Sequence, residues 1–471
     1  MTEKNRFNYY IILIFLISIS FRLINIENFG LWQDELHTFF NADPSVTFLE
    51  TFERLKGLNG TYHREDNTIL YFYILKYFLL LTDYNPLFAK LFNVIIGSTI
   101  PFLIYLICKI HVSEKIATIC ALFVGINIFL IHQSQELRPS IFVVFVSLIS
   151  ILFFLKNYKK LYSIKKSGIY ILLNTLMLSA HPFTSFILVG KSLYILSIEK
   201  ISKKFIFFNL FCLLSLLFFF ILNYDYILER IEISPADKAN SYAQLELKFF
   251  INFFFRTFFG TITFGALNLL IILYLIFNLK FKIYKNKFLR FVSLQIFSIY
   301  FCLLFFTLFI TPVIAPRYIL FVLPLILIWI ICSINLKLKK NIPYYVLFSI
   351  TVINTFTVLE NPYIPRPNTN LALNFITNNN KVLNVYSNNG ILKDNYIKHH
   401  RQFKNGKLKY IDINKIDIVD KVWIICQNQP RSIVRKFNPD LDNCSLNNPN
   451  FKYNELKRFN PDYILKLYEK N

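Results

Sequence analysis

The sequence predicts an α-helical polytopic membrane protein that ends in a small α/β domain, and three observations indicate this fold class. The chain has 471 residues, of which 55% are hydrophobic and only 17% charged, and its mean hydropathy is +0.45. Long apolar runs recur as far as residue 359, with basic residues in the short segments between them. After residue 360 the apolar runs become short. Such a composition is typical of a membrane protein and not of a soluble core.

The apolar runs predict eleven membrane spans. A span needs about 20 predominantly apolar residues, or somewhat fewer where a short helix packs among others. The predicted spans cover residues 7–26, 86–107, 116–132, 139–156, 168–180, 182–198, 205–222, 262–280, 290–311, 318–335 and 342–359. An odd number of spans places the two termini on opposite sides of the membrane.

The basic residues predict the orientation. About 20 of the 51 lysines and arginines lie in six segments: Lys4 with Arg6, Lys109 with Lys115, 156–166, 199–204, 280–290 and 337–340. An excess of basic residues is typical of cytoplasmic loops. A cytoplasmic N-terminus places all six segments inside and leaves outside the loops 27–85, 133–138, 223–261 and 312–317 and the tail. We therefore expect a multi-pass protein of the cytoplasmic membrane. The net charge is +23, but the basic residues are dispersed between the spans and form no continuous face that could bind nucleic acid.

Two further apolar runs are predicted to lie in the outer membrane interface. Residues 68–81, "TILYFYILKYFLLL", have Lys76 in the middle and are too short to span, so we expect their aromatic side in lipid. Residues 246–259 contain Lys248 and Arg256, whose long side chains can reach the lipid headgroups.

The chain divides into a transmembrane domain, residues 1–359 with the first outer loop 27–85, and an extracytoplasmic domain, residues 360–471. In the second domain a Pro/Asn-rich linker precedes a helical pattern, "NLALNFITNN", and two apolar runs, "KVLNVYS" and "DKVWIICQ", that predict buried strands. We interpret it as a packing or acceptor-docking module without catalysis. A disulfide between Cys426 and Cys444 stays an open alternative for an outside tail.

The first candidate catalytic residues are Asp34 and Glu35, in "NFGLWQDELHTFF" directly after the first span. One interpretation is structural, because acids at a helix start interact favourably with the helix dipole. The neighbouring Trp32 favours a functional one, since tryptophan anchors in the headgroup layer and would hold the acids close to lipid phosphates.

Three cations at predicted outer ends of spans are candidates for binding a phosphate: Lys90, Arg138 and Arg317. The planar guanidinium of arginine suits phosphate, although each cation could instead pair with Glu136 or with lipid headgroups. Acids opposite cations on an outward face suit chemistry on a lipid phosphate.

Five segments in this order resemble the GT-C fold of membrane glycosyltransferases. They are the acid pair, "NTILYF" (67–72), "HQSQELRPSIFVVFVSLIS" (132–150), "SAHPFTSFILV" (179–189) and "PRYILFVLPLILIWI" (316–330). The resemblance covers nearly all of residues 1–335 and is closest to the bacterial relatives of the protein O-mannosyltransferase and aminoarabinose transferase group, which is glycosyltransferase family 39-like. The sequence departs from the family pattern where Asn67, Thr68 and Ile69 replace H-P-P, where Lys90 replaces arginine, and where Leu137 and Ser140 replace alanine and tyrosine.

The resemblance implies an inverting transfer of a sugar from a polyprenyl-phosphate donor to a hydroxyl of a cell-envelope glycan, lipid or protein. Asp34 would be the general base and Glu35 its helper, with Lys90, Arg138 and Arg317 facing the donor phosphate. One base suffices, because phosphate leaves without a protonating acid. Residues that could contact acceptor or donor are Trp32, His37, Asp66, Tyr71, Glu136 and His181. The residue spacing predicts no metal site, and a divalent cation stays an open alternative.

Other functions remain as alternatives. A transporter or flippase of lipid-linked glycans would show internal repeats or charges deep in its helices, and the sequence shows no convincing repeat and few such charges, Lys191 among them. An O-antigen-type polymerase or ligase would carry its large outer loop late in the chain. An interaction protein would depend on its outer tail.

Overall fold

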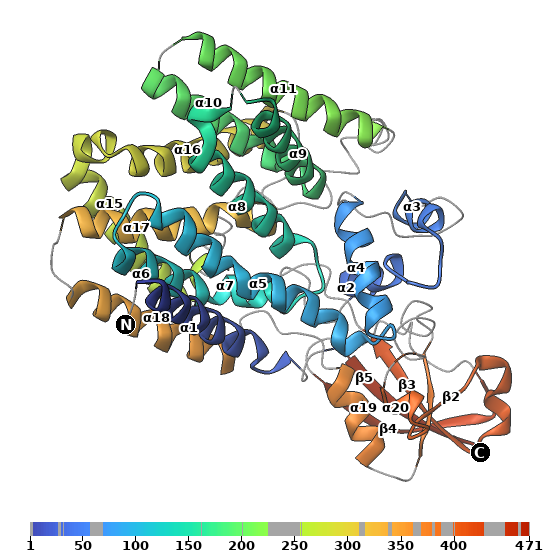
Figure 1. The fold of residues 1–471 in the computed structure, drawn as a ribbon. Coiled ribbons are helices and arrows are strands. Elements are labelled where there is room, and N and C mark those ends of the chain that lie inside the picture. The colour runs from blue at the N-terminus through green and yellow to red at the C-terminus, as the bar shows by residue number, and fades with distance from the viewer. Residues whose placement is uncertain are drawn as a thin grey trace.

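The computed structural model describes residues 3–26, 30–31, 33–56, 69–161, 163–199, 201–224, 255, 257–309, 316–337, 342–360, 369–378, 382–387, 399, 401–427, 448–459 and 463–470. A bundle of helices forms the larger part of the molecule, and a smaller domain built on a five-stranded sheet follows it (Figure 1).

Helices occupy every predicted span. They are α1 (Glu3–Leu23), α5 (Pro86–Lys109), α6 (Glu114–Gly125), α7 (Ile128–Ser134), α8 (Ser140–Asn157), α9 (Ile164–Ala180), α10 (Ser185–Glu199), α11 (Lys203–Leu222), α15 (Ile262–Lys285), α16 (Lys287–Phe309), α17 (Leu323–Lys337) and α18 (Ile342–Glu360). Among the described residues 7 helices are long and apolar enough to cross a membrane, or 8 if α6 and α7 form one span. The polytopic helical fold is thus confirmed, while a total of eleven spans stays a prediction.

The predicted span 116–132 is broken into α6 and α7, which are bent by 59°. Asn127 begins α7, since its side-chain oxygen accepts hydrogen bonds from Phe129 N and Leu130 N at 3.1 Å each. Two side chains satisfy carbonyl groups released at the break. Arg22 donates to Gly125 O (2.8 Å), and the Thr355 hydroxyl donates to Ile126 O (2.8 Å). Partners from distant helices therefore allow the span to bend inside an apolar bundle.

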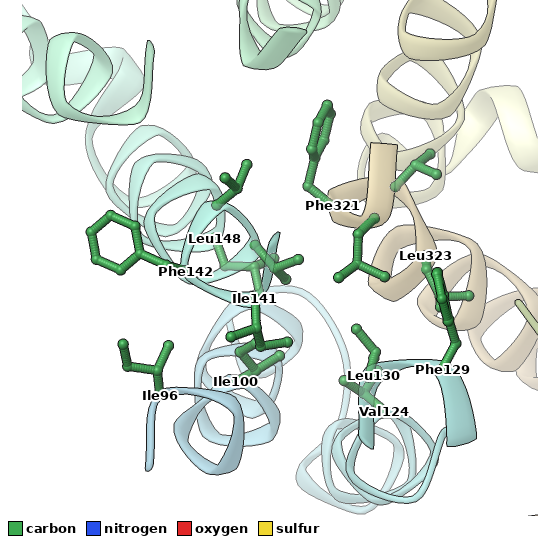
Figure 2. Close-up of a cluster of buried hydrophobic side chains, with 14 of the residues drawn as sticks. Ile96, Ile100, Val124, Phe129, Leu130, Ile141, Phe142, Leu148, Phe321 and Leu323 are labelled. Carbon is green, nitrogen blue, oxygen red and sulfur yellow. The ribbon is translucent and has the colours of Figure 1, made fainter. Parts of the chain in front are cut away.

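The core lies where α5, α6, α7 and α8 meet α17 and the short helix η5 (Pro316–Val322) that precedes it. Figure 2 shows Ile100, Leu130, Ile141 and Phe321 among the buried side chains of this cluster. The candidate span Arg317–Lys337, which combines η5 and α17, is the most enclosed among the described residues, with 89% of its apolar stretch buried. The short helix η5 therefore packs against α8.

Three short helices follow α1 in the described part of the segment 27–85: α2 (Gln33–Asn41), α3 (Phe48–Lys56) and α4 (Leu70–Leu81). The Lys76 ammonium group of α4 is buried and donates to Val46 O, to Thr47 O (3.3 Å) and to the Thr51 hydroxyl (2.9 Å). Because these acceptors surround the start of α3, Lys76 joins α3 to α4.

Helix α4 differs in one respect from the predicted interfacial helix. Tyr71 and Phe72 are fully buried, and the Tyr71 ring lies 5.8 Å from the rings of Phe92 and Phe142. The expectation that the aromatic side faces lipid is therefore wrong for these two residues, because both are buried and Tyr71 packs against α5 and α8. Leu81, at the end of the helix, is exposed. The second predicted interfacial run, 246–259 with Lys248 and Arg256, lies outside the described residues except for 255 and 257–259.

The C-terminal part has the predicted α/β character. It contains α19 (Thr369–Asn378), β1 (Asn384–Tyr386), α20 (Arg401–Lys404), β2 (Lys409–Tyr410), β3 (Lys421–Gln427), β4 (Phe451–Phe459) and β5 (Tyr463–Lys470). The strand order is β2-β1-β3-β5-β4, with β1 parallel to β2 and β3, and β5 antiparallel to β3 and β4. Both predicted strands and the predicted helix are present. Cys444 lies outside the described residues, so its pairing stays a prediction.

Candidate active site

The acid pair lies in the first turn of α2. Negative charges are favourable there, because they interact with the positive end of the helix dipole. Consecutive side chains on a helix diverge by about 100°. As a result, the Asp34 side chain is 34% exposed, whereas Glu35 is 1% exposed. Of the two acids, Asp34 is the one that a substrate could reach.

The Glu35 carboxylate binds two groups inside the protein. Its Oε1 accepts a hydrogen bond from Leu137 N (2.6 Å) and lies 3.7 Å from Lys90 Nζ. The Lys90 ammonium group also donates to Gly30 O (2.9 Å), and both charged side chains are almost fully buried. Glu35 and Lys90 therefore join α2, α5 and the segment before α8, and Lys90 has an acid as its counter-ion.

Asp34 forms an ion pair with Arg317, which is remote from it in the sequence. Arg317 Nη1 in η5 lies 3.2 Å from Asp34 Oδ2, across 283 positions of sequence. The guanidinium carbon of Arg317 lies 5.3 Å from the centre of the Tyr318 ring. Both side chains of the ion pair are about one-third exposed, so this acid and this cation can meet a ligand together.

Arg138 holds the backbone of α2. Its Nη1 donates to Asp34 O (2.9 Å) and to the Thr38 hydroxyl (2.8 Å). The neighbouring Glu136 accepts a hydrogen bond at Oε2 from Gln133 Nε2 (2.9 Å). The sequence motif that contains Glu136 and Arg138 thus packs directly against the acid-bearing helix.

Asn93 is a site residue that the sequence analysis missed. It is fully buried in α5, and its Nδ2 donates to Glu136 O (2.5 Å) and Arg138 O (2.7 Å). The Tyr71 hydroxyl donates to Asn93 Oδ1 (3.2 Å). Tyr71 therefore acts on the motif segment through Asn93. A buried amide in the apolar run after Lys90 was the signal that could have identified this residue.

Two histidines differ in their placement. His37 is buried on α2, in the same helix as the acids. His181 lies between α9 and the short helix η3 (Pro182–Thr184), outside the predicted spans, with its ring centre 5.5 Å from that of Tyr318. Burial, and secondarily the charge of Arg317, lowers the pKa of His181 to about 4. The neutral ring accepts a hydrogen bond at Nδ1 from Phe183 N (3.2 Å).

The structure thus brings together Asp34, Glu35, Lys90, Arg138 and Arg317, with His181 adjoining through Tyr318. Trp32 and Asp66 lie outside the described residues. Within the described part of the chain, no group of three or more His, Cys, Asp and Glu side chains is arranged to hold a metal ion.

Comparison with known proteins gives information on the fold. No protein-family model and no curated protein matches the sequence. Among solved structures, ArnT from Cupriavidus metallidurans in the apo state matches with a TM-score of 0.53 and 11% identity, over 79% of this chain and 69% of ArnT. The oligosaccharyltransferase of Archaeoglobus fulgidus matches with a TM-score of 0.48 and 11% identity, over 88% of this chain and 67% of its own. The chain therefore has the GT-C fold of polytopic membrane glycosyltransferases, as its sequence motifs imply.

Proposed function

We propose that this protein is an inverting glycosyltransferase. It moves a sugar from a polyprenyl-phosphate carrier to a hydroxyl of a cell-envelope glycan, lipid or protein at the outer face of the cytoplasmic membrane. The observation that carries the proposal is the partly exposed ion pair of Asp34 and Arg317, an acid for the acceptor beside a cation for the donor. The fold supports it, since ArnT from Cupriavidus metallidurans has also been solved bound to undecaprenyl phosphate.

The proposed reaction is a single displacement at the anomeric carbon. The Asp34 carboxylate takes the proton of the acceptor hydroxyl as the acceptor oxygen bonds to the anomeric carbon. The bond between that carbon and the carrier phosphate breaks, and its electron pair leaves with the phosphate. Arg317 stabilises the charge that grows on the leaving phosphate. Its guanidinium carries five N–H donors, enough to bind Asp34 and a phosphate oxygen together.

The remaining charged residues have positioning roles in this proposal. Glu35 and Lys90 form a buried pair that fixes α2 against the segment before α8. Arg138 fixes the Asp34 backbone. Of the three cations expected to face the donor phosphate, we assign that role to Arg317, because Lys90 is only 3% exposed and Arg138 Nη1 is bound to α2. The two adjacent acids are thus one catalyst and one support.

The test is transfer of radiolabelled sugar from polyprenyl phosphate in purified membranes. Replacement Asp34→Asn keeps the shape and an oxygen acceptor for Arg317 but removes the base, so the transfer rate should fall about 100-fold or more. Glu50→Gln on α3 is the matched control, since it neutralises an exposed acid of the same loop that pairs with Arg54 (2.7 Å). Transfer at the wild-type rate in the Asp34 variant would contradict the assignment. A flippase would move labelled donor and form no product.

A further inference from the structure

We propose that the C-terminal domain holds α2 in place through Tyr84, which makes Tyr84 a positioning residue. The inference depends on the proposed function only in regarding α2 as the catalytic helix. It assigns to the C-terminal domain a task beyond packing or acceptor docking, namely control of the helix that carries Asp34.

Tyr84 is joined to α2 by two contacts. Its ring stacks on that of Phe39, with ring centres 4.1 Å apart and planes 2° from parallel. Its hydroxyl donates to Phe39 O (3.0 Å). Phe39 is fully buried and lies within α2, little more than one turn after Asp34. A displacement of Tyr84 therefore acts on the same short helix as Asp34.

The turn that carries Tyr84 is strained. Asp83 and Tyr84 have φ values of +52° and +48°, in the left-handed region. For residues other than glycine this conformation is sterically unfavourable, because Cβ comes too close to the following carbonyl oxygen. The turn is also very short, because Tyr84 N still donates to Leu79 O of α4 (2.9 Å) while Asn85 already begins α5 by accepting from Leu87 N. A bulky tyrosine persists in this conformation only if its contacts offset the strain.

The C-terminal domain contacts both residues of the strained turn. The His399 ring meets the Tyr84 ring edge to face, with centres 4.6 Å apart and planes at 68°. Lys404, at the end of α20, lies 2.8 Å from Asp83 Oδ2 and also donates to Asp83 O (3.2 Å). The turn is thus held between α2 on one side and the C-terminal domain on the other. Loss of the domain contacts would remove part of what offsets the strain and would loosen α2.

The test uses the full-length protein in lipid nanodiscs and the double variant His399→Ala, Lys404→Ala. Both substitutions lie in the C-terminal domain and leave Tyr84 and α2 unchanged. Backbone hydrogen exchange of residues 33–41 should become about threefold faster or more, since an aromatic contact and an exposed ion pair together are lost. Lys407→Ala, an exposed lysine of the same domain, is the matched control and should leave this exchange unchanged.

Exchange in β3 and β5, measured in the same experiment, shows whether the domain stays folded. Unchanged exchange of α2 in the double variant with those strands protected would overturn the proposal. If the strands also lose protection, Tyr84→Phe decides, because it removes the hydrogen bond to Phe39 O and keeps both ring contacts. This variant should speed exchange in α2 alone, and wild-type exchange in α2 would again overturn the proposal.

Sugar transfer supplies an independent readout. The double variant should lower kcat several-fold and leave KM for the donor unchanged, because α2 positions the base and Arg317 is untouched. If the wild-type protein transfers no sugar, the proposed function fails, while the exchange experiment still decides whether the C-terminal domain holds α2.

Discussion

Asp34 and Glu35 are neighbours in the chain, yet their carboxylates lie in opposite environments. Asp34 is partly exposed beside Arg317, and Glu35 is buried between Leu137 N and Lys90. A buried acid with a buried counter-ion is costly to disturb, because removing one partner leaves the other charge without compensation. The contribution of Glu35 to holding the fold together can therefore be measured as a change in the free energy of unfolding.

Replacement Glu35→Gln should lower the free energy of unfolding by about 3 to 5 kcal/mol, since Lys90 keeps its charge in a buried position. The glutamine can still accept the hydrogen bond from Leu137 N, so the loss reports the missing charge. A thermal unfolding curve in detergent measures the effect.

The double variant Glu35→Gln, Lys90→Met is the control for this prediction. It removes both charges, and replacing a buried ion pair by residues of similar volume is often close to neutral. It should therefore unfold at a temperature nearer to the wild type than the single variant does. Equal destabilisation in both variants would show that the ion pair is not the cause.

At the residue scale, the sequence motifs predicted a set of candidate residues but not the partner of each one, and the roles of these residues stay a prediction. The structure brings Asp34, Glu35, Lys90, Arg138 and Arg317 together, as the motif order implies. Which cation meets which acid depends on the directions of side chains that are remote in sequence, 55 positions apart for Glu35 and Lys90 and 283 for Asp34 and Arg317. A local sequence pattern does not reveal which remote residues come into contact. For this reason the sequence did not predict the role of Asn93, whose partners are remote in sequence.

At the scale of elements, Lys191 shows how a buried charge joins helices. Its ammonium group in α10 is fully buried and donates to the Ser150 hydroxyl of α8 (2.6 Å) and to Asn174 Oδ1 of α9 (3.0 Å). The rings of Phe154 and Tyr170 lie 5.7 Å and 5.2 Å from it, at distances suited to a cation–π interaction. These contacts give the charge noted in the sequence a structural role.

Replacement Lys191→Met should destabilise the bundle by about 1 to 2 kcal/mol, because Ser150 and Asn174 lose a donor in an apolar interior. Thermal unfolding in detergent measures this loss. Lys204→Met is the control, since Lys204 is exposed and pairs with Glu199 at 3.7 Å near the start of α11. Equal shifts in the two variants would contradict the role assigned to Lys191.

The boundaries of most elements follow from composition, but the break between α6 and α7 does not. Apolar runs and polar interruptions locate the helices, and short apolar runs locate β1 and β3. The predicted span 116–132 contains no proline, and its bend depends on Arg22 and Thr355, which are remote in sequence. Long-range hydrogen bonds of this kind cannot be read from the segment that they bend.

At the scale of the whole molecule, the basic segments predict that the acid-bearing loop faces away from the cytoplasm. We expect a membrane-impermeant maleimide to label Ser45→Cys in intact cells and to label Ser163→Cys only after lysis. Both serines are exposed, the first between α2 and α3 and the second before α9. Replacement of Cys426 and Cys444 by serine removes background from the tail. Labelling of Ser163→Cys alone in intact cells would reverse the orientation and exclude the proposed reaction at the outer face.

The overall fold was predictable because several weak motifs occur in a fixed order over most of the bundle. Each motif alone is short, and the H-P-P positions of one are replaced by Asn67, Thr68 and Ile69. Their order nevertheless implied the fold that ArnT also has. The contact of the C-terminal domain with Tyr84 was not predictable, because it depends on two consecutive left-handed residues that no composition signals.

The bent span has a consequence for distance. Helix α7 has 7 residues and is therefore about 10 Å long. With a bend of 59°, its far end lies about 10 Å from the point that a straight continuation of α6 would reach. Opening the angle by about 6° would move Leu137 by about 1 Å, enough to break its 2.6 Å bond to Glu35. The position of α2, the helix that carries both acids, is thus linked through Leu137 and Glu35 to the angle between α6 and α7.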